Sequence, residues 1–139
     1  MAYWLLKSEP RTWSWDDQLK KGDKGEGWDG VRNYQASNNM KKMEIGDLAF
    51  FYHSVNEKSI VGIVSIIEKY QDDPTDKTGR FGMVVVKAIK SFTKSVSLSE
   101  IKSNQKLQGI SLIKQSRLSV MPITKEHWDI ILEMGETSI

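Results

Sequence analysis

The chain has no cysteine and only two histidines, His53 and His127. The absence of cysteine excludes disulfides and thiolate metal ligands, and it is typical of proteins from a reducing compartment. A zinc site needs three or four ligands, which two separated histidines do not supply. We therefore expect neither a metal nor another cofactor.

Long apolar runs are also absent. The apolar segment at the N-terminus ends at Lys7, which is too short for the hydrophobic region of a secretory signal. No stretch approaches the ~20 apolar residues that a membrane-spanning helix requires. These absences predict a cytoplasmic protein with no membrane partner.

Acidic residues are scarce in one long segment. Between Lys77 and Lys125 there are 10 basic residues and one acid, Glu100, which gives 10 − 1 = +9, whereas the whole chain carries only +2. Such a bias indicates a face that meets an anionic partner, nucleic acid first, with Lys87 and Lys90 as candidate contacts to its backbone. The alternative is a set of solvated lysines scattered over several strands.

The chain also lacks the common sequence motifs of catalytic and phosphate-binding sites. There is no phosphate-binding P-loop, no GxGxxG and no HExxH. His53 is next to Ser54, too close in sequence to identify a nucleophile and its base. We expect a non-catalytic protein, and the alternative is a nucleic-acid-processing enzyme that uses His53 with Lys7 or Ser54.

The pattern of strand and helix signals predicts a single α+β domain over residues 1–139. Ser14, Ser97 and Thr124 have the spacing of helix N-caps. Because the segments do not alternate regularly between strand and helix, we expect a small mixed β-barrel of about five strands with short helices packed around it. Strands are predicted at 2–7, 48–53, 59–70, 82–89, 111–113 and 117–120, helices at 14–21, 31–43, from 98 and after 124, and core positions at Trp4, Phe50, Phe51 and Trp128.

The most unusual segment is WDGVRNYQASNN, from Trp28 to Asn39. Amides are mediocre helix formers, but they offer both donors and acceptors to the edge of a base. Gly30 permits close backbone approach, and a helix N-terminus favours phosphate. Trp28 with Tyr52 or His53 could stack on a base. The alternative is a buried polar network that fixes the helix to the barrel.

Six blocks of the chain resemble the EVE domain family: YWLLKSEP, WSWDD, WDGVRNYQA, GDLAFFYHS, IVGIV and RLSVMPI, in this order between Tyr3 and Ile123. The resemblance implies a PUA-like barrel related to PUA, ASCH and YTH domains. It also implies a pocket that accepts a flipped, modified base, with modified cytosine in DNA favoured. The alternative is an RNA-binding accessory domain that has no preference for a modified base.

Matching the blocks position by position implies a base pocket. Asn33 and Ser8 are expected at the Watson–Crick edge, Trp28 and Tyr52 as stacking rings, and Arg32 and Arg117 at phosphates. The full set is Lys7, Ser8, Trp28, Arg32, Asn33, Tyr52, His53, Ser54, Arg117 and Ser119.

The chain departs from the family pattern where relatives often have a tryptophan and, a few residues later, an acid. Phe81 and Val85 stand near those places. If the tryptophan forms part of the base cage, Phe81 stacks more weakly there. We expect the chain to act as a monomer that passes recognition to an effector protein.

Overall fold

The computed structural model describes all 139 residues and contains one six-stranded mixed sheet. The strand order is β2-β5-β4-β3-β1-β6, in which β1 and β3 are parallel and the other neighbours are antiparallel. The strands are β1 (Tyr3–Ser8), β2 (Glu26–Gly27), β3 (Leu48–His53), β4 (Ser59–Asp72), β5 (Gly82–Ser97) and β6 (Val120–Ile123). The helices are α1 (Trp15–Lys21), α2 (Tyr34–Lys41), α3 (Leu98–Ser103), α4 (Ser111–Lys114) and α5 (Lys125–Met134), with 3₁₀ turns η1 (Gly22–Lys24) and η2 (Gln105–Leu107).

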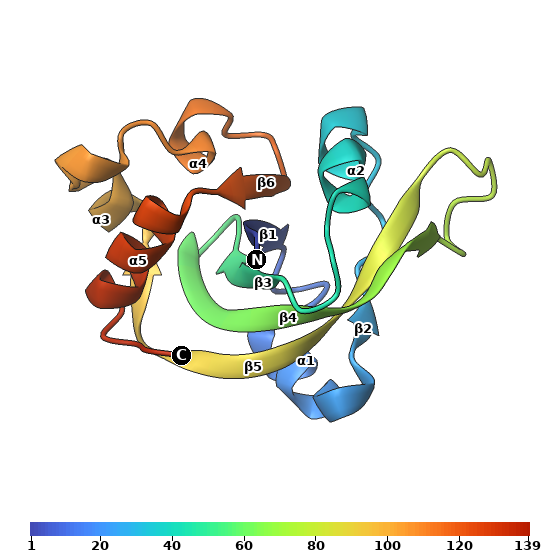
Figure 1. The fold of residues 1–139 in the computed structure, drawn as a ribbon, viewed down its shortest axis with the longest axis horizontal. Coiled ribbons are helices and arrows are strands. Elements are labelled where there is room, and N and C mark those ends of the chain that lie inside the picture. The colour runs from blue at the N-terminus through green and yellow to red at the C-terminus, as the bar shows by residue number, and fades with distance from the viewer.

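The sheet is strongly curved because its two longest strands bend. The β4–β5 pairing shifts register at four places, and such irregularities increase local twist and bending. Figure 1 shows β4 and β5 curling beneath β1 and β3. The ladder ends at β2 on one side and β6 on the other, so its hydrogen bonding does not close a barrel. The sheet has six strands where about five were expected. It includes the short β2, which lies in a glycine-rich segment predicted as loop, whereas the predicted segment 111–113 is not a strand.

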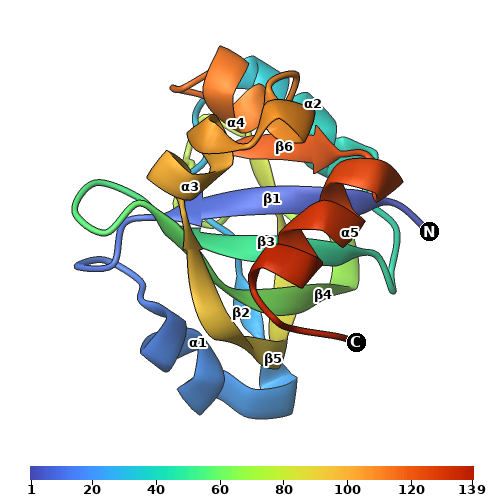
Figure 2. The ribbon, with the colours of Figure 1, turned by 90° about the vertical axis from the view of Figure 1, so that its left-hand side faces the viewer.

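The core forms where α5 and the inner strands meet. Trp4, Phe50, Phe51 and Trp128 are all buried, as predicted. Trp128 of α5 stacks on Phe50 of β3 with ring centroids 3.9 Å apart, and on Tyr3 of β1 at 4.6 Å. This packing holds α5 across the strands, as Figure 2 shows. None of the helices has the length and apolar character needed to cross a bilayer.

The three predicted helix caps are confirmed. Ser14 and Ser97 each form a capping box, with Asp17 and Glu100 respectively, and the Thr124 hydroxyl accepts the His127 N–H. These signals work because they depend only on residues three positions apart.

Three element predictions were wrong. The predicted helix 31–43 begins only at Tyr34, because Asn33 is extended and its Oδ1 caps Ala36 N–H. The predicted strand 111–113 is helix α4. The predicted strand 117–120 is a turn followed by β6, which tolerates Pro122 because it is an edge strand.

Candidate functional site

A cleft of about 470 Å³ lies between the end of β1, the turn that follows it, and the segment around β2. This volume is typical of ligand sites. Its walls are formed by two stretches that are distant in sequence. The lining residues are Lys7, Ser8, Glu9, Thr12, Trp13, Glu26, Gly27, Trp28, Asp29 and Gly30.

Trp28 forms one wall and is firmly held. Its backbone N–H donates to the Val84 carbonyl at 2.7 Å, which extends the pairing of β2 with β5. Its indole is 7% exposed and meets Phe51 edge to face, with centroids 5.5 Å apart. The ring therefore presents only a limited surface to the cleft, in a fixed orientation.

Trp13 also lines the cleft and was absent from the predicted site. The Ser8 hydroxyl donates to the Trp13 carbonyl, which folds the turn back onto the end of β1. The half-buried indole donates its Nε1–H to Gln18 Oε1 at 2.9 Å. Trp13 begins the WSWDD block. The sequence of that block does not show whether its rings line a cleft or belong to the core.

Three carboxylates line the cleft, and only Asp29 has no partner. Glu9 accepts hydrogen bonds from Arg11 N–H and Thr12 Oγ1, and Glu26 forms an ion pair with Lys21 at 3.2 Å. Asp29 forms no side-chain hydrogen bond to another residue and no ion pair. Its pKa is raised by burial and by the nearby charges of Asp73 and Glu26, while Arg32 opposes them.

A cation sits at the other end of the cleft. The Lys7 ammonium donates to the Ser116 carbonyl at 2.8 Å. Burial, with Lys58 as a second cause, lowers the pKa of Lys7. The cleft therefore combines two indole rings with a free carboxylate and a partly desolvated ammonium.

Behind the Trp28 wall, Asp73 fixes the loop that carries Asp29 and Gly30. Its buried carboxylate accepts from Gly30 N–H at 2.8 Å, Arg32 Nη1 at 3.0 Å, and both Thr75 N–H and Oγ1 at 2.7 and 2.6 Å. Burial alone would raise the pKa of Asp73, but hydrogen bonds from Thr75, Gly30 and Arg32 outweigh it and lower the pKa. This loop forms the rim of the cleft, and it is therefore fixed by a network of satisfied hydrogen bonds around Asp73.

Of the ten predicted pocket residues, Lys7, Ser8 and Trp28 meet in the cleft. Arg32 lies behind the rim on Asp73, and Asn33 caps α2. Tyr52 is 3% exposed and belongs to the core, where burial raises its pKa to about 12. These positions favour structural roles for Asn33 and Tyr52, which were expected at the base, and for Arg32, which was expected at a phosphate.

His53 lies on the edge of α1 rather than in the cleft. Its Nε2 accepts the Trp15 N–H at 3.0 Å, so this nitrogen cannot also act as a base while the bond is present. Its Nδ1 is buried, without a hydrogen-bond partner, 3.6 Å from Glu57 Oε2. The Ser54 N–H donates to the Ser8 carbonyl, which ties the end of β3 to β1.

The remaining predicted residues surround the cleft at different distances. Ser119 accepts the Lys7 N–H with its carbonyl, and the exposed Arg117 precedes it in a turn, so both lie on the Lys7 side. Lys87 lies 3.7 Å from Asp23, and Lys90 donates to the Ser138 carbonyl at 2.5 Å near the C-terminus.

Phe81 and Val85, where the chain departs from its family's pattern, do not line the cleft either. Phe81 contacts Tyr34 and Arg32 beyond the rim. Val85 is 8% exposed and pairs with Gly27 in the β2–β5 ladder. Phe81 therefore does not take the place of a cleft ring in this structure.

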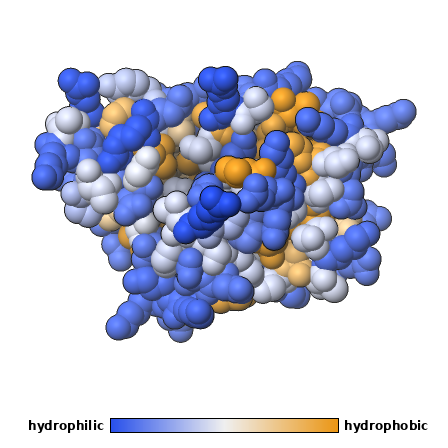
Figure 3. Space-filling model, turned by 180° about the vertical axis from the view of Figure 1, so that it is seen from behind, coloured by the Kyte–Doolittle hydropathy of each residue, from blue (hydrophilic) through white to orange (hydrophobic).

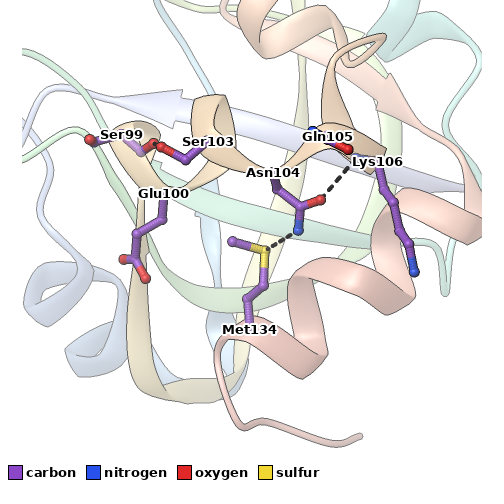
Figure 4. A pocket seen from close by; sticks show the side chains of 7 residues that line it. All are labelled: Ser99, Glu100, Ser103, Asn104, Gln105, Lys106 and Met134. Carbon is purple, nitrogen blue, oxygen red and sulfur yellow. Dashed lines mark hydrogen bonds between the residues drawn. The ribbon is translucent and has the colours of Figure 1, made fainter.

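A larger hollow, of about 630 Å³, lies elsewhere between α3, η2 and α5. Figure 4 shows that mostly polar side chains surround it, with Asn104 Nδ2 pointing to Met134 Sδ at 3.5 Å. It has no aromatic ring to hold a flat ligand, so the cleft is the better candidate.

The back of the molecule is mostly hydrophilic, and hydrophobic residues show between the hydrophilic ones (Figure 3).

Comparisons with known proteins agree on one family. The family model described as EVE domain matches residues 2–134. The mouse thymocyte nuclear protein 1 is 34% identical over 97% of this chain and 74% of its own length.

Two solved structures are similar over almost the whole chain. A crystal structure of an Agrobacterium tumefaciens protein has a TM-score of 0.96 and 45% identity, covering 99% of this chain and 94% of that one. The human THYN1 protein in complex with 5-methylcytosine-containing DNA has a TM-score of 0.91 and 30% identity, covering 100% of both chains. With the family model matching nearly every residue, the chain belongs to the EVE domain family.

Proposed function

We propose that the chain is a non-catalytic nucleic-acid-binding domain that takes one modified base, a modified cytosine in DNA, into the cleft between Trp13 and Trp28. The observation that carries the proposal is the pairing of two indoles with the unpartnered Asp29 carboxylate in one cleft. The complex of the similar human protein with 5-methylcytosine-containing DNA supports the same ligand class.

Stacking on two aromatic rings can offset the free-energy cost of taking a base out of a duplex. Extruding a base from a duplex costs a few kcal/mol. Stacking on an aromatic side chain contributes about 1–3 kcal/mol per base, so two flanking indoles can offset the cost. Burying one methyl contributes only about 0.8 kcal/mol, which corresponds to about fourfold in affinity. We therefore expect a modest preference for 5-methylcytosine over cytosine.

The polar groups of the cleft suit the edge of cytosine. Cytosine presents the N4 amino group as a donor and N3 as an acceptor. A carboxyl that carries a proton can accept from the amino group with one oxygen and donate to N3 with the other. In the proposal Asp29 has this role, while Lys7 and the nearby Arg117 favour the phosphate side.

The test is a tryptophan-fluorescence titration with short oligonucleotides that differ at one base. The panel contains cytosine, 5-methylcytosine, 5-hydroxymethylcytosine, adenine and N6-methyladenine, each in DNA and RNA. We expect tightest binding to a modified cytosine in DNA. Trp28→Ala and Trp13→Ala should erase the preference, whereas the matched Trp13→Phe, which keeps a ring, should retain most of it.

Two outcomes would contradict the proposal. Equal, salt-sensitive binding to every oligonucleotide would make the chain a general RNA- or DNA-binding domain, as its basic segment alone would allow. Turnover of a nucleic acid that His53→Ala abolishes would make it an enzyme. In the proposed role the chain acts as a monomer and leaves any chemistry to an effector protein.

A further inference from the structure

Beyond the rim of the cleft, one aromatic side chain is conspicuously exposed. Tyr34 is 61% exposed, and it is the only one of the 13 aromatic residues that is mostly accessible to solvent. Its ring packs against that of Phe81, with centroids 4.9 Å apart and planes inclined by 37°. In this pair Phe81 is partly buried and Tyr34 is open to solvent.

Both members of the pair are held in place. Tyr34 is the first residue of α2, directly after the Asn33 cap. The Phe81 N–H donates to Asp76 Oδ2 at 2.8 Å, and Asp76 Oδ1 accepts from Thr78 N–H and Oγ1 at 2.9 and 2.6 Å. In Figure 1 the β4–β5 hairpin projects from the body of the molecule beside α2. The backbone on both sides of the pair is therefore held by local hydrogen bonds.

Three basic residues lie near the pair. The Arg32 guanidinium carbon lies 5.8 Å from the Phe81 ring centroid, and the side chain is 39% exposed. Val31, Asp73 and Thr75 accept three of the five guanidinium N–H groups, which leaves two for a ligand. Lys77 and Arg80, in the same hairpin loop as Phe81, are exposed and form no ion pair.

Carboxylates lie among these cations. Asp73 is buried within its four hydrogen bonds, one of which forms the ion pair with Arg32. Asp76 accepts from Thr78 and Phe81, and the Thr78 hydrogen bond is the main cause that lowers its pKa to about 2. Asp29 and Asp72 are exposed, as are Lys77 and Arg80, which have no ion-pair partner. An exposed aromatic ring beside unpaired cations is a combination that binds single-stranded nucleic acid.

We propose that the Tyr34–Phe81 pair is a second stacking site, for a base of the same strand near the base held in the cleft. The proposal rests on the proposed function of the cleft. Tyr34 is four positions after Gly30 on the cleft rim, a Cα–Cα span of at most about 14 Å even for an extended chain. Bases in one strand of stacked DNA are spaced by about 3.4 Å, so the partner base lies within about four positions. Since every base has a π-face, this site adds affinity without adding preference for the modification.

The experiment compares Tyr34→Ala with the matched variant Tyr34→Phe. The probes are single-stranded DNA oligonucleotides with one central cytosine or 5-methylcytosine, with intact bases or with abasic positions for four nucleotides on both sides. We expect Tyr34→Ala to weaken binding of both intact probes about 5- to 30-fold. Tyr34→Phe should stay within about twofold of wild type. The abasic probes should bind wild type and Tyr34→Ala equally.

The outcomes separate this proposal from that of the cleft. Wild-type affinity of Tyr34→Ala for intact probes, with Trp28→Ala still erasing the preference, would overturn the second site and leave the cleft in place. If Tyr34→Ala changes the ratio between the probes, Tyr34 reads the modified base and is no separate site. If wild type shows no preference between cytosine and 5-methylcytosine, the cleft proposal fails. A loss of affinity in Tyr34→Ala on intact probes only would still support the second site in that case.

Discussion

At the scale of single residues, the proposed function makes the protonation of Asp29 decisive for the recognition of cytosine. A carboxylate and the N3 atom of cytosine are both acceptors, so they repel each other unless one proton lies between them. Burial and the charges of Asp73 and Glu26 raise the pKa of Asp29, which makes this proton easier to retain, whereas Arg32 acts in the opposite direction. Binding of cytosine should therefore be linked to uptake of a proton.

This linkage predicts the pH dependence of binding. Because the complex holds one more proton than the free partners, affinity for 5-methylcytosine DNA should rise as the pH is lowered from about 8 to about 5, by at most about tenfold per pH unit. The rise should level off once free Asp29 is protonated. Asp29→Asn provides the same donor and acceptor without a titrating proton. It should bind with little pH dependence, and Asp29→Ala should bind weakly at every pH.

Fluorescence titrations of the three proteins over this pH range make the comparison. The free oligonucleotide also gains protons at low pH, but it does so equally in all three series. An affinity of the wild type that falls on acidification, or an Asp29→Asn protein that follows the wild-type profile, would show that Asp29 does not meet the base edge.

At this scale the structure brings together only part of the predicted pocket. Lys7, Ser8 and Trp28 line the cleft. Tyr52 does not, because the strand β3 is buried on both sides, and alternation then cannot distinguish a core face from a ligand face. Trp13 and Asp29 were missed because their placement depends on the Ser8–Trp13 contact and on Asp73, which are tertiary interactions.

At the scale of elements, local signals were sufficient for the helix caps but not for short segments. The capping residues were predicted because each bond joins neighbours in sequence. Helix α4 has four residues and β2 has two, too few for a hydrophobic period to appear. Strand β2 exists because β5 offers it an edge, and this pairing is what positions Trp28 at the cleft.

A glycine in β4 determines how α1 packs on the sheet. A Cβ at Gly62 would overlap the Trp15 ring, which is rigid and buried. Trp15 donates its Nε1–H to Ser91 Oγ at 2.9 Å and meets Phe51 edge to face at 5.1 Å. The close approach of strand and ring therefore requires the missing side chain.

Gly62→Ala should consequently destabilise the fold. We expect a loss of about 1–3 kcal/mol in the free energy of unfolding, because the ring must move out of its packed position. Gly109 is exposed, and a Cβ there would have no other atom within 4 Å, so Gly109→Ala is the matched control, with a change of at most about 0.5 kcal/mol. Urea unfolding followed by tryptophan fluorescence measures both. Equal stability of the two variants would mean that Trp15 is not confined against β4.

At the scale of the whole molecule, charge is distributed unevenly along a nearly neutral chain. The net charge is +2, while the segment from Lys77 to Lys125 carries 10 − 1 = +9. In the fold this segment spans β5, the helices α3 and α4, and β6, so its cations do not form one compact patch. Lys87 and Lys90 belong to β5 itself, where Lys87 is only weakly compensated by Asp23, which is exposed.

Backbone contacts by these lysines predict a salt effect that is independent of the base. Lys87→Ala and Lys90→Ala should weaken binding of modified and unmodified DNA equally. Each should also reduce the slope of log affinity against log salt by about 0.7 for a single strand or about 0.9 for a duplex, since one fewer counterion is released. Lys125→Ala is the control, because its ammonium already donates to both Asp129 oxygens at 2.8 and 2.9 Å.

Measuring the slope, rather than affinity at one salt concentration, is what separates a phosphate contact from a loss of packing. A variant that binds weakly with an unchanged slope has lost a contact that releases no counterion. If Lys87→Ala and Lys90→Ala both show the affinity and the salt slope of Lys125→Ala, the bound DNA runs on another side of the molecule. Lys7, which lines the cleft, the nearby Arg117 and the cations near the Tyr34–Phe81 pair would then be the ones to substitute.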